Sequence, residues 1–206
     1  MIYIVDYGAG NLTSVLKGLR AAGAVPVIAR APQDLAGAAG IVIPGVGHYG
    51  ATRSLDREWR AAIGSAIGRG VPLLGICLGM QWLYEGSDEA PDAGGLGIFE
   101  GRVFRLSGAV KVPHVGWNAL RAAASSPLLA DVSDGAEAYF THGYAAPIGF
   151  GTIALTHHGE PFASIVARDN VCGMQFHPEK SGRTGITLLR NWVASRALKG
   201  RVTHAL

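Results

Sequence analysis

Short apolar runs alternate with helix-patterned segments through the first half of the chain, and this alternation constrains the fold more than any other feature. Two segments have apolar residues at helical spacing: 12–19, which Asn11 is placed to cap, and 54–67. The apolar runs around them, each typical of a buried strand, are residues 2–6, 25–29, 40–45 and 71–76. Strands that alternate with helices predict an α/β fold with a parallel sheet covered on both faces.

The pattern changes after Gly86. A polar segment rich in glycine and proline, 87–97, predicts a loop, and a final helix is expected over 184–198. Between them lie shorter strand candidates with hairpin-like connections, at 99–106, 111–120, 138–144, 151–156, 162–168 and 171–176. No internal repeat or second boundary is visible, so the sequence predicts one domain over 1–206, with antiparallel strands added in its second half.

Charge and cysteine content exclude several classes of protein. The 206 residues carry a formal charge of only +3 and the basic side chains are scattered, so we expect no nucleic-acid partner. The two cysteines form no disulfide framework, and Cys172, with a glycine on one side only, is expected to be an inert core thiol. The chain opens without the features of a signal peptide and has no uninterrupted membrane-spanning stretch. We therefore expect a cytoplasmic protein without membrane contact.

The segment GICLG, residues 75–79, places Cys77 between two glycines where a strand gives way to a helix starting near Leu78. A residue at such a sharp turn has strained backbone geometry, and the residues two before and two after it must be small. This is the logic of the G-x-S-x-G nucleophile elbow, with sulfur in place of oxygen. The helix start favours a thiolate, and the Leu78 N–H is a candidate oxyanion donor. A structural cysteine among glycines that permit close packing explains these five residues equally well.

A cysteine nucleophile needs a base, and the base needs a group that orients it. His177 lies at the end of the run 171–176, and Glu179 follows two residues later. In extended backbone these two side chains point to the same side, and Pro178 biases His177 towards that geometry. Cys77, His177 and Glu179 thus fit the roles of nucleophile, acid/base and orienting carboxylate. A polar surface turn is the alternative; a metal site is not expected, because no third ligand has suitable spacing.

Together, GICLGMQ and FHPEK resemble the active-site motifs of the class I, triad-type glutamine amidotransferases. Further segments resemble one branch of that family, in which a glutaminase subunit supplies ammonia to a separate cyclase subunit of histidine biosynthesis. They are IVDYGAGNLTSV (4–15), PGVGHYG (44–50), PHVGWN (113–118), YFTHGY (139–144) and FHPEKSG (176–182), which spread over nearly the whole chain. The resemblance implies the fold of that family, a flavodoxin-like, mostly parallel sheet flanked by helices.

The resemblance also implies a reaction and the residues that perform it. Cys77 attacks the side-chain carboxamide of glutamine to form a thioester and release ammonia, and His177, assisted by Glu179, transfers the protons. Segment 44–47 is the oxyanion strand of the family. The implied oxyanion donors are the backbone groups of Val46, Gly47 and Leu78, and the implied glutamine-binding residues are Gln81, Gly143 and Tyr144. No cofactor is implied.

A cyclase partner follows from the same resemblance. The cyclase is a (β/α)₈ barrel that forms a heterodimer with the glutaminase, receives its ammonia and switches it on when the cyclase binds its own ligand. The positions that match the interface of the branch are Asn11, Trp117, Tyr139 and Lys180. Each also has a plain structural interpretation: Asn11 as a helix cap, the two aromatic residues as core, and Lys180 as a solvated lysine.

Two glycines depart from the pattern of the branch, and other functions stay open. Many members have a hydroxyl residue in place of Gly143 and a serine in place of Gly182; if substrate were held by a hydroxyl at 143, glutamine affinity would suffer. The alternatives are a triad glutaminase serving pyridoxal phosphate, GMP or anthranilate synthesis, a non-catalytic regulatory module of the same fold, and a cysteine peptidase or hydrolase on a related fold. The combined motifs favour the histidine-pathway glutaminase.

Overall fold

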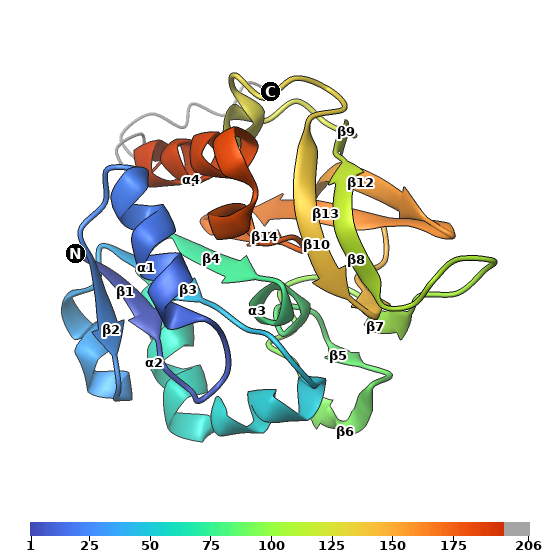
Figure 1. Cartoon of the computed structure of the whole chain (residues 1–206). Helices are drawn as coiled ribbons and strands as arrows, with labels where there is room; N and C mark the ends of the chain where they lie inside the picture. Colours follow the sequence, from blue (N-terminus) through green and yellow to red (C-terminus); the bar gives the residue numbers. More distant parts are fainter. Residues whose placement is uncertain (196–206) are drawn as a thin grey trace, which may run out of the picture.

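An eight-stranded sheet forms the centre of the structure, a computed structural model that describes residues 1–195 (Figure 1). In spatial order its strands are β2 (Pro26–Ala29), β1 (Ile2–Val5), β3 (Gly40–Ile43), β4 (Leu73–Ile76), β14 (Val171–Met174), β13 (Glu160–Arg168), β12 (Thr152–His158) and β9 (Arg121–Ala122). Neighbours from β2 to β14 are parallel, and neighbours from β14 to β9 are antiparallel. The predicted α/β class is confirmed, including the antiparallel addition.

Both faces of the parallel part are buried under helices. The long helices are α1 (Leu12–Ala21), α2 (Arg57–Gly68) and α4 (Gly182–Ser195). Ile4 and Val42 belong to the apolar cluster that includes residues of α1 and α4, whereas Ile41 and Ile43 belong to the cluster that includes α2. Burial on both faces explains why these strands are continuous apolar runs in the sequence instead of alternating ones. No helix within residues 1–195 is long and apolar enough to cross a membrane.

The helix starts follow from capping side chains. Asn11 accepts a hydrogen bond of 3.1 Å from the Ser14 N–H and caps α1, as predicted. The helix expected over 54–67 begins later, at Arg57, because Asp56 is its cap and the preceding residues form the 3₁₀ helix η2 (Tyr49–Ser54). The final helix begins at Gly182, and the last part of its predicted range, 196–198, lies outside the described residues.

Two smaller sheets complete the second half. One pairs β8 (His114–Ala119) with β10 (Glu137–His142); the other has the order β11 (Tyr144–Ala145), β7 (Arg102–Arg105), β5 (Gly86–Ser87) and β6 (Ala90–Gly94). Shorter 3₁₀ helices are η1 (Pro32–Gly37) and η3 (Pro127–Leu129).

The expectation of a loop over 87–97 is wrong, because β5 and β6 form a hairpin there. Ser87 pairs with Ala90, and β5 also pairs in parallel with β7. β6 lies at the edge of its sheet, the position in which a strand tolerates a proline such as Pro91. Pairing with β7, which is distant in sequence, orders a segment whose own composition indicates a turn.

Candidate active site

Cys77 occupies a sharp turn between β4 and the single-turn helix α3 (Leu78–Gln81). Its φ of 53° lies in the region that residues other than glycine rarely adopt. A Cβ on Gly75 would lie 2.6 Å from the Gly79 carbonyl oxygen, and a Cβ on Gly79 would overlap the Ile43 carbonyl oxygen. The flanking glycines therefore permit the turn, which is the geometry expected from GICLG. Because α3 has only one turn, its dipole is smaller than the sequence suggested, and individual N–H groups matter more.

His177 and Glu179 form a buried pair. The His177 Nδ1–H donates to Glu179 Oε1 at 2.8 Å, and the two side chains are only 5% and 1% exposed. The contact was predicted, but its backbone basis was not. Pro178–Lys180 is a 3₁₀ helix, η4, so Glu179 reaches back across a turn instead of along an extended strand. Helix α1 packs closely over this pair, since a Cβ on Gly18 would lie 3.0 Å from the Glu179 Cβ.

Strand pairing brings His177 towards Cys77. β14 lies beside β4 in parallel, with Met174 opposite Ile76, so the two chains leave the sheet at the same edge. Burial alone lowers the pKa of His177, but interactions with Cys77 and Glu179 outweigh it and raise the pKa to about 10. Its buried Nε2 has no other hydrogen-bond partner among the described residues, and the nearby sulfur contributes to the raised pKa. An imidazole beside a cysteine can exchange a proton with the reacting groups at the sulfur.

A small cavity of about 40 Å³ opens beside the sulfur. It is lined by Gly47, Cys77, Leu78, Gln81, Glu89, Thr141, His142, Gly143 and Tyr144. Most of the positions expected to stabilise the oxyanion or bind glutamine are thus together. Val46 is the exception, because it is 43% exposed and does not line the cavity. No group of three or more His, Cys, Asp or Glu side chains within residues 1–195 is arranged to hold a metal ion.

Two side chains at this site were not predicted from the sequence. The fully buried Gln175 places its Nε2 at 3.7 Å from the Cys77 sulfur and accepts a hydrogen bond of 3.2 Å from Gln81 Nε2. Glu89 brings a carboxylate to the cavity from the β5–β6 turn, in a segment expected to be a loop. The one signal for Gln175 was an amide within an otherwise apolar run shortly before His177; nothing distinguished Glu89 from a solvated acid.

Segment 44–47 is anchored at its start and again two residues after its end. At its start, the buried Tyr7 hydroxyl donates to the Pro44 carbonyl oxygen at 2.8 Å. Burial, and secondarily the nearby Cys77, raises the pKa of Tyr7, so this hydroxyl keeps the proton that it donates. After the segment, the Tyr49 N–H donates to Glu89 Oε2 at 2.7 Å. The intervening Gly47 has a φ of 107°, which favours glycine.

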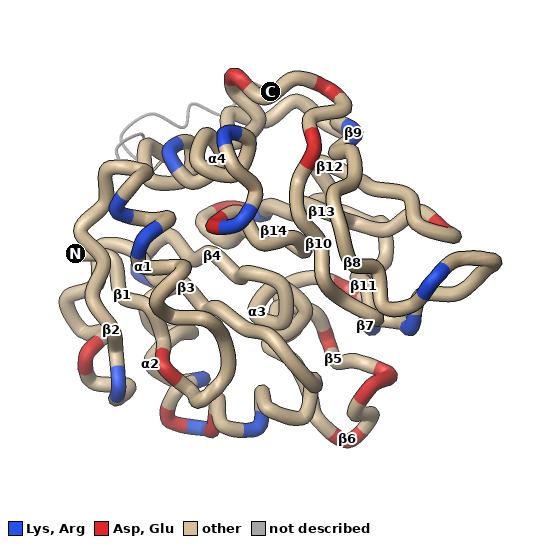
Figure 2. Tube along the Cα trace, in the orientation of Figure 1, with Lys and Arg blue, Asp and Glu red and all other residues tan. Residues whose placement is uncertain are grey.

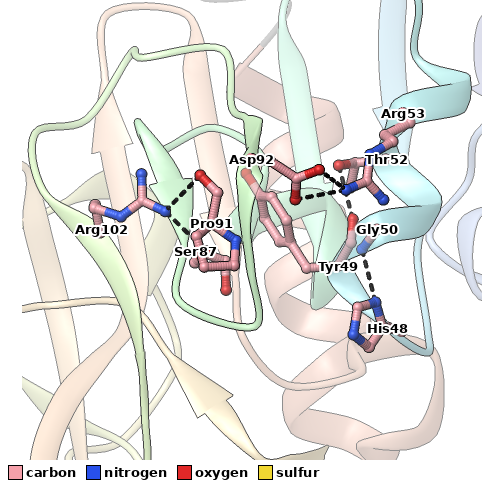
Figure 3. A network of polar contacts seen from close by, with 9 residues as sticks. All are labelled: His48, Tyr49, Gly50, Thr52, Arg53, Ser87, Pro91, Asp92 and Arg102. Carbon is pink, nitrogen blue, oxygen red and sulfur yellow. Dashed lines mark hydrogen bonds and ion pairs between the residues drawn. The ribbon is translucent and has the colours of Figure 1, made fainter.

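Figure 3 shows the polar contacts that anchor the chain after this segment. The Thr52 hydroxyl donates to the Tyr49 carbonyl oxygen at 2.8 Å, and Arg53 forms an ion pair of 2.6 Å with Asp92 of β6. Arg102 of β7 donates to the Ser87 carbonyl oxygen at 2.9 Å. These contacts connect η2 and β7 with the β5–β6 hairpin, whose turn carries the Glu89 that lines the cavity.

The four expected interface residues lie on connected elements. Trp117 is 53% exposed, so it is not a plain core aromatic, and its ring meets the half-buried Tyr139 edge-on at 6.0 Å. Lys180 is exposed on η4, which contacts α1 and β10. Asn11 is the α1 cap, so its structural interpretation is correct whatever else it contacts.

Residues 3–195 match the family model "Glutamine amidotransferase class-I", and the chain belongs to this family. Two similar solved structures share its fold at 19% identity. One, titled "Crystal structure of glutamine amidotransferase", has a TM-score of 0.74 and covers 96% of this chain and 100% of its own. The other, the structure of PurLQS from Thermotoga maritima, has a TM-score of 0.75 and covers 94% and 97%.

Curated relatives are closer in sequence and carry one particular name. The protein from Halobacterium salinarum is 49% identical over 201 residues, which cover 93% of this chain and 92% of the relative. The protein from Thermococcus kodakarensis is 46% identical over 198 residues, which cover 93% and 98%. Both are named imidazole glycerol phosphate synthase subunit HisH.

Proposed function

We propose that this chain is the glutaminase subunit of an imidazole glycerol phosphate synthase. It hydrolyses glutamine to glutamate and ammonia, and a cyclase subunit uses the ammonia. The observation that carries the proposal is the convergence of Cys77, at its strained turn, with the buried His177–Glu179 pair. Relatives with that subunit name, 41–49% identical to this chain, supply the pathway.

The reaction follows from the positions of these three side chains. The Cys77 sulfur bonds to the carboxamide carbon of glutamine. The developing oxyanion accepts hydrogen bonds from the backbone N–H groups of Leu78 and of segment 44–47. The C–N bond breaks as His177 donates its proton to the leaving amine, which yields ammonia and a γ-glutamyl thioester. Water, deprotonated by His177, then hydrolyses the thioester to glutamate. Glu179 keeps the ring oriented through Nδ1.

The cavity residues support an arrangement for the rest of the glutamine substrate. The Glu89 carboxylate is suited to the α-ammonium group, and backbone groups at Gly143 and Tyr144, supported by Gln81, are suited to the remaining polar atoms. A Cβ on Gly143 would meet its nearest neighbour, Val112, at 3.7 Å, an ordinary contact. A side chain at 143 is therefore permitted but not required, and a backbone contact at 143 makes this departure from the family pattern harmless.

The cyclase completes the proposed reaction. Ammonia passes into its barrel and reacts with a phosphoribulosyl-formimino aminoimidazole carboxamide nucleotide to form imidazole glycerol phosphate and aminoimidazole carboxamide ribotide. The two subunits form a heterodimer in the cytoplasm, with Asn11, Trp117, Tyr139 and Lys180 at or near the interface. Ligand binding in the cyclase activates the glutaminase by reorienting segment 44–47, which lies between the contacts of Tyr7 with Pro44 and of Glu89 with Tyr49.

A glutaminase assay with and without the cyclase tests this function. The chain alone should hydrolyse glutamine slowly, and the cyclase with its bound nucleotide should raise the rate by about two orders of magnitude or more, the scale on which oxyanion-hole donors act. The unliganded cyclase is the control and should give little increase. Full activity of the chain by itself would rule out a gated subunit, and inactivity under all conditions would rule out a glutaminase.

Trp117→Ala tests the interface. Exposed aromatic residues dominate many interfaces, so this substitution should weaken binding of the cyclase about tenfold or more, measured by titration calorimetry. Phe150→Ala is the control, because Phe150 is 84% exposed and lies on the 148–150 loop instead of β8. Equal cyclase affinity for the Trp117 variant and wild type would remove Trp117 from the interface.

A further inference from the structure

A row of polar side chains connects β8 and β10 beneath the exposed surface of β8. Asn118 Nδ2 lies 3.2 Å from His114 Nε2, and His114 Nδ1 lies 3.2 Å from His142 Nε2. His142 Nδ1 in turn lies 2.8 Å from the Tyr144 carbonyl oxygen. Both histidines are buried, with 4% and 6% exposure. The mechanism proposed above uses neither ring.

The groups at the two ends of the row determine the direction of every hydrogen bond between them. The Tyr144 carbonyl can only accept, so His142 carries its proton on Nδ1, and its Nε2 accepts from the His114 Nδ1–H. His114 Nε2 then accepts from the Asn118 amide. The orientation of that amide is set independently, since Asn118 Nδ2 also donates to the His157 carbonyl oxygen at 3.1 Å and Oδ1 accepts from the Ala119 N–H at 2.8 Å. Two neutral rings, both protonated on Nδ1, satisfy all four ring nitrogens.

The row continues to the cysteine. The Tyr144 carbonyl oxygen that accepts from His142 also accepts from Gln81 Nε2 at 2.8 Å. Gln81 Nε2 contacts Gln175 Oε1 at 3.2 Å, and Gln175 Nε2 points at the Cys77 sulfur at 3.7 Å. Polar contacts therefore run without a break from Asn118 on β8 to the nucleophile.

The geometry points to His114 and His142 as positioning residues of the glutaminase site. As a neutral pair of fixed direction, they hold the Tyr144 carbonyl and, through Gln81 and Gln175, the glutamine subsite and the Cys77 sulfur. This inference rests on the proposed glutaminase function. Strand β8 then has two roles. Val115 and Trp117 are exposed on its outer side, where Trp117 belongs to the proposed cyclase interface, and His114 and Asn118 on its inner side begin the row.

The surroundings keep the pair neutral. Burial, followed by the nearby His158 of β12, lowers the pKa of His114 to about 4. Burial also lowers the pKa of His142 to about 3; the bond to Tyr144 opposes this shift, and His114, His158 and His177 add to it. Besides these histidines, Cys77, Glu89 and Tyr144 are titratable groups that line the same cavity as His142. A proton added to either ring would meet an existing donor, because each accepting nitrogen already receives an N–H.

Ring nitrogen NMR of the full-length protein, alone and with the cyclase, tests the arrangement directly. Signals of His114 and His142, assigned with the variants His114→Gln and His142→Gln, should report neutral rings protonated on Nδ1 from about pH 5.5 to 8, above both lowered pKa values. An Nε2–H tautomer or an imidazolium at either ring in that range would overturn the inference. This measurement does not depend on glutaminase activity.

Asn118→Asp tests the positioning role by reversing one hydrogen bond. A carboxylate can only accept, so His114 Nε2 must gain a proton and the pair must become charged at neutral pH. We expect an imidazolium signal, a glutamine KM about tenfold higher, the scale of one buried hydrogen bond, and a pH profile shifted relative to wild type. His142→Gln should also raise the glutamine KM about tenfold and leave cyclase affinity unchanged.

His158→Gln is the matched control. His158 stacks on His114 with ring centroids 4.0 Å apart but donates to the Lys111 carbonyl oxygen, outside the row. The His158→Gln variant should keep a glutamine KM within about twofold of wild type and an unshifted pH profile, because burial, the larger cause, still keeps the pair neutral. Unchanged KM and pH profile in folded Asn118→Asp and His142→Gln proteins would refute the positioning role while the glutaminase function stands. An inactive wild-type protein would refute the function, whereas the ring spectra would still decide the arrangement of the pair.

Discussion

Replacement of Cys77 by alanine is expected to abolish glutamine hydrolysis, with a loss of about 10⁴-fold or more relative to the cyclase-activated wild type. Removal of a nucleophile in a triad costs a factor of this order or more, since the other members have nothing to activate. The glutaminase rate is measured by glutamate release in the presence of the cyclase and its nucleotide. Synthesis from high concentrations of external ammonia should continue, because the cyclase is untouched.

Cys172→Ala provides a matched control for this substitution. Cys172 is the other buried free cysteine, and burial raises the pKa of its thiol, so it stays a neutral core group on β14. The Cys172 variant should keep a glutaminase rate within about twofold of wild type once folded. Retention of glutamine hydrolysis in Cys77→Ala, or its loss only in Cys172→Ala, would reject the assignment of the nucleophile.

Gly79→Ala is expected to destabilise the protein by more than about 3 kcal/mol, or to prevent folding. The added methyl would overlap the backbone carbonyl of Ile43, which belongs to a fully buried strand and cannot move like a flexible side chain. The free energy of unfolding, measured by urea denaturation, should fall accordingly. A variant as stable as wild type would show that α3 and β3 are not in this close contact.

Gly64→Ala is the corresponding control, and its expected effect on the free energy of unfolding has the opposite sign. Gly64 is exposed within α2 and has no neighbour within 4 Å of an added Cβ. Alanine there should raise the free energy of unfolding by about 0.5–1 kcal/mol, because glycine is the poorer helix former. The two substitutions add the same methyl group, so their difference reports the crowding at the elbow alone.

The sequence predicted the main sheet well because its strands carry their own signal. β1, β3 and β4 are buried on both faces, which requires continuous apolar runs, and Asn11 marks a helix start by its side chain. β5 and β6 carry no such signal. Their residues favour turns; β5 becomes a strand by pairing with β7, and β6 by pairing with β5.

The elbow was predictable for a related reason, whereas the surrounding side chains were not. Two glycines at fixed offsets from a cysteine are a local consequence of a sharp turn. Contacts such as Gln175 with Cys77, or His114 with His142, join different strands and depend on their register. No local pattern encodes that register. The pairing of His177 with Glu179 was predicted for an incomplete reason, because η4, not extended backbone, brings the side chains together.

Strand β14 has a consequence for how the protein matures on the ribosome. It is the last strand within residues 1–195, yet it lies between β4 and β13 in the interior of the sheet. Until it has emerged and docked, β4 and β13 each lack one of their two neighbours, and Cys77 lacks the His177 imidazole. Closure of the sheet and assembly of the glutaminase are therefore one late event in biosynthesis, and a nascent chain that still lacks β14 holds a cysteine with no means to consume glutamine.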